Sequence, residues 1–502
     1  MMTDNYALNI KKEKRSLVRI DSFRIFPGEI TFLFGESGIG KSLISRALYG
    51  LLDPQDLNIS INDAPYNHYL SSEKTIERKK NSFFVFQEPS SHLNPLETLA
   101  LQLNEGDLKE ADDEEKLLTR LWDGADHLKI EDLLSIYPKP YRPSGGEKQR
   151  ILLTMAFKKI NLTQKKRANF QDTFFVFDEP TGSLDNHYRN IFLDILFEKF
   201  ERHPFSALII THDYSIISEI FNRHKNLLSN VRFNELSREG DRVVQNDFSP
   251  DNYLNWLKNA PKFTPLKINT TSSNSPALVL KSGLQVFNYK LTFFDKNQKQ
   301  TDLKISPGEM VYLKAPSGTG KTTIAKIIMG LIAAKNLDME IAGYKIGDKT
   351  AINFYKRKIW GKAAGLVFQH ADEALNLKST VTEIFKGLPL KRKKRISNLK
   401  DQFNHLFIKE SEDGHFLKKQ TAFLSGGQKQ RLNILRTVIL NTKLLILDEP
   451  LNGLDFESIK VVLRMFSERQ KAGTGILLIS HNEEIFGKIV PEDNIYYLTA
   501  KQ

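Results

Sequence analysis

Residues 35–42 read GESGIGKS, and residues 315–322 read APSGTGKT. The first string has the pattern G-x-x-x-x-G-K-[ST], in which glycines let backbone N–H groups point at one phosphate and the lysine neutralises its charge. In each copy an apolar strand leads into the loop, and a segment with apolar residues at helical spacing follows it. A helix that begins here presents its positive N-terminus to an anion. The order of strand, loop and helix therefore predicts a nucleotide-phosphate site in an α/β fold.

The phosphate loop is the first member of an ordered set of strings that occurs twice. FVFQEP and LVFQHA follow the loops, then PSGGEKQR and LSGGQKQR, then FFVFDEP and LLILDEP, and finally IITHD and LISHN. The copies lie 280 residues apart at Lys41 and Lys321 and 281 apart at Ser144 and Ser425, but 270 apart at Asp178 and Asp448. The change places an extra stretch of about 11 residues in the first copy, within residues 157–173. The Lys, Arg, Asn and Gln content of this stretch predicts a solvated insertion.

The composition describes ordinary globular protein. The chain has 502 residues, 40% hydrophobic and 26% charged, with a net charge of +12 and no cysteine. Disulfides, thiolate metal sites and cysteine nucleophiles are therefore excluded, and acidic partners such as nucleotides, RNA or an anionic membrane surface are favoured. No apolar run reaches the 18 or more residues that span a bilayer, and the first residues lack the pattern of an export signal. We expect a cytoplasmic location.

The repeat divides the chain into two domains. A segment rich in Pro, Ser, Thr and Asn lies between the copies and is typical of a linker. We predict a first domain at residues 1–261, a linker at 262–276 and a second domain at 277–502. The runs FFVF, LLIL, ALII and ILLI are continuous apolar segments, as in buried parallel strands. Each domain is therefore predicted to be α/β with a mostly parallel sheet.

The phosphate-binding candidates follow from the two loops. In the first copy they are Gly35, Ser37, Gly38, Gly40, Lys41 and Ser42. In the second they are Ser317, Gly318, Gly320, Lys321, Thr322 and Thr323. Ala315 stands where the first glycine of the second loop is expected, which puts the entry turn of that loop in question.

Acidic pairs follow two of the apolar strands. Asp178 and Glu179, like Asp448 and Glu449, come at the carboxyl end of a strand, where α/β proteins hold their ligands. The aspartates are placed to hold Mg²⁺, and the glutamates are placed to polarise an attacking water. His212 and His481 each end a further apolar run, and their recurrence favours a role at the terminal phosphate.

The combined strings resemble the nucleotide-binding domains of ATP-binding cassette (ABC) proteins, twice over, across nearly the whole chain outside the linker. The resemblance implies tandem P-loop NTPase domains of ABC type, each with a sheet core and a helical subdomain between the Gln and the SGG string. LSGGQ at Leu424 to Gln428 resembles the family signature, and PSGGE at Pro143 to Glu147 resembles a looser version of it. GSLD and NGLD, which end at Asp185 and Asp455, resemble the family's D-loops.

The resemblance also implies a mechanism. Two such domains are expected to pair head to tail within one chain, so that each phosphate loop with its ATP meets the other domain's signature. The signature residues are then Ser144, Gly145 and Gly146 in the first copy and Ser425, Gly426 and Gly427 in the second. The expected Mg²⁺ ligands are Ser42, Gln87 and Asp178, and Thr322, Gln369 and Asp448; the catalytic residues are Glu179, His212, Glu449 and His481. We expect hydrolysis at both sites, slower at the second, because Ala315 and PSGGE both belong to it. Phe294 or Tyr289 is the candidate for stacking on adenine in the second copy.

The string FQEPSSHLNP resembles ATPases of oligopeptide, dipeptide and nickel importers. This likeness implies a peripheral ATPase on the cytoplasmic face of the membrane, with integral-membrane permease subunits and a solute-binding protein as partners and no nucleic acid. The alternative is a soluble tandem ABC ATPase acting on the ribosome or on nucleic acid, but the long charged hairpin of the ribosome-associated proteins is absent. The run KRKKR at Lys391 to Arg395 is consistent with a solvated helix face, lipid contact or RNA contact. The sequence does not identify the solute.

Overall fold

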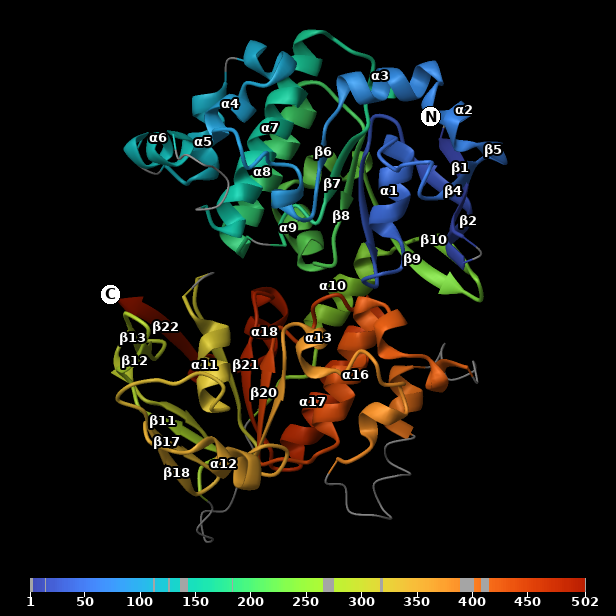
Figure 1. The fold of residues 1–502 in the computed structure, drawn as a ribbon. Coiled ribbons are helices and arrows are strands. Elements are labelled where there is room, and N and C mark those ends of the chain that lie inside the picture. The colour runs from blue at the N-terminus through green and yellow to red at the C-terminus, as the bar shows by residue number, and fades with distance from the viewer. Residues whose placement is uncertain are drawn as a thin grey trace. The chain divides into compact units, whose positions relative to one another are not determined.

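The computed structural model describes residues 3–13, 15–111, 113–124, 127–135, 143–182, 184–264, 275–316, 319–388, 401–407 and 415–501. The chain forms two compact units, Met1–Leu254 and Asn255–Gln502, each described by itself below (Figure 1). Within the second unit the Phe263 amide donates to the Ile489 carbonyl at 2.7 Å, and Gln470 Nε2 donates to the Thr264 carbonyl at 2.7 Å. Residues 265–274 of the predicted linker lie outside the described residues, and the predicted boundaries stay a prediction.

The first unit is built on a six-stranded sheet in the order β10-β9-β3-β8-β7-β6. All neighbours in it are parallel except β9 and β10. Its strands are β3 (Ile30–Gly35), β6 (Phe84–Val85), β7 (Phe175–Asp178), β8 (Ala207–Ile210), β9 (Val231–Glu239) and β10 (Arg242–Asp247). An antiparallel sheet, order β2-β1-β4-β5, contains β1 (Asp4–Lys12), β2 (Arg15–Ile25), β4 (Asn58–Ile61) and β5 (Ala64–Pro65). β3, β7 and β8 are buried along their whole length, as continuous apolar runs predict.

The second unit repeats this arrangement. Its larger sheet has the order β12-β13-β22-β16-β21-β20-β19, with β14 paired to β13. The strands are β12 (Leu284–Val286), β13 (Tyr289–Phe294), β14 (Gln300–Thr301), β16 (Met310–Lys314), β19 (Ala364–Val367), β20 (Leu444–Asp448), β21 (Gly475–Ile479) and β22 (Ile495–Lys501). The antiparallel sheet, order β15-β11-β17-β18, contains β11 (Leu278–Leu280), β15 (Leu303–Ile305), β17 (Asp338–Ile341) and β18 (Tyr344–Gly347). The predicted α/β class with a mostly parallel core is confirmed in both units.

Helices cover the sheets and form the predicted helical segments between the Gln and the SGG string. The α-helices of the first unit are α1 (Lys41–Tyr49), α2 (Tyr66–Leu70), α3 (Glu73–Asn81), α4 (Leu99–Leu103), α5 (Glu114–Leu121), α6 (His127–Ser135), α7 (Gly145–Lys165), α8 (Asn186–Arg202) and α9 (Ser215–Arg223), and α10 (Pro250–Lys258) spans the boundary. Those of the second unit include α11 (Lys321–Ile328), α12 (Ile352–Phe354), α13 (Ala371–Ala374), α16 (Gly426–Val438), α17 (Phe456–Lys471) and α18 (Glu483–Ile489). Short helical turns are η1 (Pro89–Ser91), η2 (Gly106–Glu110), η3 (Phe170–Asp172), η4 (Lys225–Asn230), the π-turn η5 (Tyr355–Ile359), η6 (Glu383–Phe385), η7 (Phe416–Lys418), η8 (Thr421–Phe423) and η9 (Glu492–Asn494). The segment Lys391 to Arg395 lies outside the described residues.

The predicted solvated insertion is confirmed only in its second part, because Lys165, Lys166, Arg167, Asn169 and Gln171 are exposed. Residues 157–165 instead lengthen α7, which has 21 residues against 13 in α16. Lys158 is buried and donates to Glu114, and Lys159 donates to Asp107 at 2.7 Å. Carboxylates from distant segments therefore make the burial of these lysines possible.

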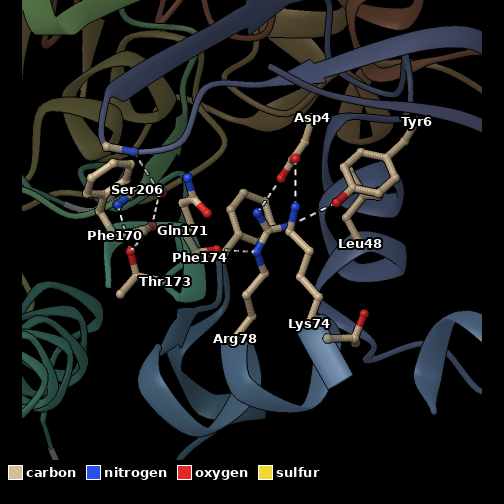
Figure 2. A network of polar contacts seen from close by, with 12 residues as sticks. Asp4, Tyr6, Leu48, Lys74, Arg78, Phe170, Gln171, Thr173, Phe174 and Ser206 are labelled. Carbon is tan, nitrogen blue, oxygen red and sulfur yellow. Dashed lines mark hydrogen bonds and ion pairs between the residues drawn. The ribbon is translucent and has the colours of Figure 1, made fainter. Parts of the chain in front are cut away.

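The end of the insertion docks on the first unit through a polar network (Figure 2). The Ser206 hydroxyl donates to the Phe170 carbonyl at 2.7 Å, and Arg78 Nε donates to the Gln171 carbonyl at 3.3 Å. Arg78 also donates to the Tyr6 hydroxyl at 2.9 Å and pairs with Asp4. The network thus connects β1, α3 and η3.

Candidate active site

The phosphate loop of the first unit connects β3 to α1. Gly35, Gly38 and Gly40 have φ angles of 134°, 84° and 114°, which glycine adopts without strain. A Cβ atom at Gly35 would lie 2.7 Å from the Leu236 carbonyl oxygen, and one at Gly40 would lie 2.5 Å from Val18 Cγ2. Both ends of the loop therefore require glycine.

Lys41 reaches back across this loop from the first turn of α1. Its ammonium group donates to the Gly35 carbonyl at 2.6 Å and to the Glu36 carbonyl at 3.1 Å. Burial lowers the pKa of Lys41, and the charges of Glu179 and Asp178 oppose that shift. Gly35 and Glu36 thus hold a buried cation that can neutralise a phosphate, and Ser37 is the next residue of the same loop.

The second loop connects β16 to α11. Gly320 has a φ of 97°, and the Lys321 ammonium donates to the Ala315 and Pro316 carbonyls. Ala315 does not occupy the positive-φ region of its counterpart Gly35, so a different entry turn accommodates its Cβ. Thr323 lies in the first turn of α11. Ser317 and Gly318 lie outside the described residues.

Most of the predicted Mg²⁺ ligands lie together. In the first unit the Ser42 hydroxyl donates to Asp178 Oδ1 at 2.9 Å, and the other Asp178 oxygen is buried with no hydrogen-bond partner among the described residues. In the second unit the Thr322 hydroxyl lies 3.2 Å from Asp448 Oδ1 and 3.4 Å from Gln369 Oε1.

Burial raises the pKa of Asp178 and of Asp448 to about 6 each. Carboxylate, hydroxyl and amide oxygens are ligands that Mg²⁺ accepts, and the orphaned Asp178 oxygen is one that a cation would satisfy. The residues therefore fit the ion. Gln87 is exposed, and no hydrogen bond joins it to Ser42 in the described part of the first unit, so its role as a ligand stays a prediction.

Glu179 lies beside His212 in the first unit. Its φ of 49° is unusual for a non-glycine residue, and its amide donates to the Ile210 carbonyl at 3.0 Å. The carboxylate lies 2.9 Å from His212 Nδ1, and its charge raises the pKa of His212 against the effect of burial. Such strain at the end of a buried strand is typical of a functional position.

Glu449 has the same backbone conformation but another partner. Its φ is 46°, and its amide donates to the Ile479 carbonyl at 2.9 Å. The Ser480 hydroxyl donates to Glu449 Oε2 at 2.9 Å, whereas His481 Nε2 lies 3.7 Å from Oε1. Burial raises the pKa of Glu449 to about 7. Ser480 was not among the predicted site residues, although its place directly before His481 matches that of Thr211 before His212.

The two SGG strings begin long helices. Ser144 caps α7 and Ser425 caps α16, each in a capping box, and Gly145, Gly146, Gly426 and Gly427 form the first turns. In α7 the Glu147 carboxylate accepts from the Ser144 amide at 2.7 Å and from its hydroxyl at 2.9 Å. In α16 the neutral Gln428 side chain accepts from the Ser425 amide at 3.1 Å. The copies thus differ by one negative charge beside the serine, and the contact of either serine with a nucleotide stays a prediction.

A family model described as ABC transporter matches residues 18–165 and 298–452. The chain is 27% identical over 511 residues to an uncharacterized ABC transporter ATP-binding protein, YejF, of Escherichia coli, which covers 95% of this chain and 90% of that protein. It is 22% identical over 557 residues to the glutathione import ATP-binding protein GsiA of Salmonella paratyphi A, which covers 98% of this chain and 84% of that protein. Among solved structures, archaeal ribosome recycling factor aABCE1, in complex with ribosomal stalk protein aP1, has a TM-score of 0.59 to this chain at 18% identity. The match covers 96% of this chain and 87% of the recycling factor, and it shows a likeness of fold alone. None of the helices described in either unit is long and apolar enough to cross a bilayer.

Proposed function

The chain belongs to the ABC transporter family and is an ATPase, and from this premise we propose that it powers uptake of peptides or a related small solute through separate membrane permease subunits. The supporting observation is similarity to import ATPases over nearly the whole length, both domains included. Two domains in one chain supply two phosphate loops, two Asp-Glu pairs and two signature strings, so no second ATPase chain is needed.

The residues then have these roles. Lys41 and Lys321 would neutralise the terminal phosphates, and Glu179 and Glu449 would orient and polarise the attacking water. His212 and His481 would hold those carboxylates and contact the terminal phosphate. Mg²⁺, when bound by the Ser42 and Thr322 sets, would offset phosphate charge. We propose head-to-tail pairing of the two domains, with the signature of each completing the site of the other.

The carboxylates are tested by the double variant Glu179→Gln with Glu449→Gln. We expect it to lose ATP hydrolysis and retain ATP binding, because each amide keeps the shape of the side chain and cannot accept the water's proton. The matched control is Glu239→Gln with Glu492→Gln, at two exposed positions, which should hydrolyse at the parental rate. Parental hydrolysis by the first double variant would overturn the assignment.

The transport role is tested by uptake. Cells that lack the chain should fail to accumulate labelled di- and oligopeptides, and the parental chain, but not the double variant, should restore uptake. The chain would be peripheral on the cytoplasmic face, bound to permeases that receive solute from a binding protein. Unchanged uptake together with nucleotide-dependent sedimentation with ribosomes would instead favour the soluble alternative.

A further inference from the structure

Basic side chains gather in the second unit at residues 344–362, which we call the basic lobe. It comprises β18, α12, η5 and the turn that follows, which are neighbouring segments of the second unit (Figure 1). Six of its side chains are cationic and exposed: Lys345, Lys349, Lys356, Arg357, Lys358 and Lys362. The single acidic side chain, Asp348, accepts hydrogen bonds from the Asn336 and Leu337 amides. The lobe therefore carries a concentrated positive charge.

The π-turn η5 fixes how three of these cations are displayed. The Trp360 amide donates to the Tyr355 carbonyl at 2.9 Å, a bond between residues five apart. Tyr355 and Ile359 at the two ends of the turn are buried, and the three residues between them, 356–358, are exposed. The wide turn thus directs both apolar ends inward and all three charges outward.

The turn is also anchored to the helix that follows the phosphate loop. A Cβ atom at Gly330 would lie 2.6 Å from the Tyr355 ring, so the ring packs directly on the backbone that ends α11. The Trp360 indole donates to the Met329 carbonyl at 2.9 Å. The charges are therefore held on a fixed support, and little ordering is required when a partner binds.

None of the six cations forms an ion pair with any residue that the structure describes; Lys362 donates to the Arg357 carbonyl at 2.6 Å. The corresponding segment of the first unit, α3, precedes β6 as η5 precedes β19, and its cations are all engaged. Lys74 and Arg78 pair with Asp4, Lys80 pairs with Glu77, and Lys79 donates to the Gly50 carbonyl. The contrast between η5 and α3 shows that the segment before this strand of the sheet can fold without unpaired cations.

Exposed apolar side chains adjoin the charges. Ile352 is 45% exposed and Tyr344 is 37% exposed. The Tyr344 ring meets the Phe354 ring edge to face at 5.9 Å, which places Tyr344 against α12 and next to η5. An exposed isoleucine makes no favourable contact with the phosphate backbone of a nucleic acid, whereas a membrane interface accepts apolar groups below a layer of cations.

We propose that the basic lobe binds directly to a membrane surface that contains anionic lipid, with its cations at the headgroups and Ile352 and Tyr344 at the level of the interface. The proposal rests on the proposed function, which brings the chain to a membrane, and it adds a contact with lipid to the contact with permeases. Each basic residue close to an anionic membrane raises affinity roughly fivefold, so the three charges of η5 account for about 100-fold.

The test uses the full chain with vesicles of phosphatidylcholine alone or mixed with phosphatidylglycerol. We expect cosedimentation with the mixed vesicles only, weakened by salt. The triple variant Lys356→Gln, Arg357→Gln, Lys358→Gln should bind about 100-fold more weakly, and Ile352→Ser should weaken binding without changing its salt dependence. ATP hydrolysis in solution should stay parental in both.

A matched control is available in the first unit. Lys165, Lys166 and Arg167 form an exposed basic triplet of the same composition, and Lys166 pairs with Asp107. Changing these three residues to glutamine should leave vesicle binding intact. The proposal is overturned if the two triple variants bind equally, if neutral vesicles bind as well as anionic ones, or if only RNA binding depends on residues 356–358. If the parental chain does not bind anionic vesicles but still supports peptide uptake, the membrane-contact proposal is overturned and the proposed function stands, because uptake is measured independently.

Discussion

The negative charge of Glu147 predicts an asymmetry between the two ATP sites that one substitution should remove. Glu147 accepts hydrogen bonds from both the amide and the hydroxyl of Ser144. Those are groups that the proposed pairing would offer to the terminal phosphate bound by the second phosphate loop. At the other signature, Gln428 makes the equivalent contact with the Ser425 amide without a charge. Glu147→Gln should therefore tighten ATP binding at the second site.

The magnitude follows from the capping geometry. A phosphate oxygen bonded to the Ser144 hydroxyl would lie about 2.8 Å from it, and Glu147 Oε2 lies 2.9 Å from the same hydroxyl oxygen. The two anionic oxygens would be at most about 5.7 Å apart, which costs about 3 kcal/mol per pair of unit charges at an effective dielectric of 20 and about half that at 40. The substitution should thus improve affinity about 10- to 100-fold. It would cost at most about 1 kcal/mol of helix stability, since an acidic group at a helix N-terminus is favourable.

The assay isolates one site at a time. A Glu179→Gln background should leave only the second site active, and there Glu147→Gln should lower the KM for ATP about 10- to 100-fold. The reciprocal variant, Gln428→Glu in a Glu449→Gln background, should raise the KM of the first site by a similar factor. An unchanged KM in both backgrounds, or an effect of Glu147→Gln on the first site alone, would refute the reasoning.

The remaining predictions concern the two phosphate loops and the polar network of the first unit. Gly35→Ala should abolish ATP binding at the first site in a filter-binding assay, because a Cβ atom there would lie 2.7 Å from the Leu236 carbonyl oxygen. In the same assay, Ala315→Gly should change ATP binding at the second site less than about twofold, because Ala315 does not adopt a positive φ. Asp4→Asn should lower the unfolding free energy of the first unit in urea by about 2–3 kcal/mol at pH 7: the Arg78 side chain is 4% exposed and loses its carboxylate, but it keeps the Tyr6 and Gln171 contacts. Burial raises the pKa of Asp4, but Lys74 and Arg78 lower it by more, so its net pKa lies below the ordinary value. The stabilisation is therefore complete above about pH 4 and lost as the pH falls further, so the difference between the two proteins should shrink in acid, and a difference independent of pH would contradict the assignment.

Features that depend on a few neighbouring residues could be predicted from the sequence. The glycines of the phosphate loop and the carboxylates at the ends of β7 and β20 are each set by a local backbone conformation. The short string around each feature therefore carries most of the information. The positive φ of Glu179 and of Glu449 recurs for the same reason, because both glutamates follow a buried strand and precede a proline.

Features that depend on distant partners could not be predicted in this way. Lys158 and Lys159 belong to a polar string, and their burial depends on Glu114 and Asp107, more than 40 residues away. Composition alone therefore predicted solvent exposure for residues that the fold buries. The basic lobe shows the opposite case, since its cations look like those of α3 in sequence but form no ion pair with any residue that the structure describes.

The two units preserve the part of the sheet that carries the chemistry and differ beside it. The order β6-β7-β8-β3-β9 in the first unit matches β19-β20-β21-β16-β22 in the second, so the loop, the Asp-Glu pair and the histidine meet at the same edge. The next strand has different origins, because β10 follows β9 directly, whereas β13 comes from the start of its unit and pairs antiparallel with β22. An outer strand can be replaced because the site depends only on the carboxyl ends of the central strands. The same freedom applies to Glu147 and to the basic lobe, which lie outside those strands, so two copies with matching Asp-Glu pairs and histidines can differ in the charge beside the signature serine and in their surfaces.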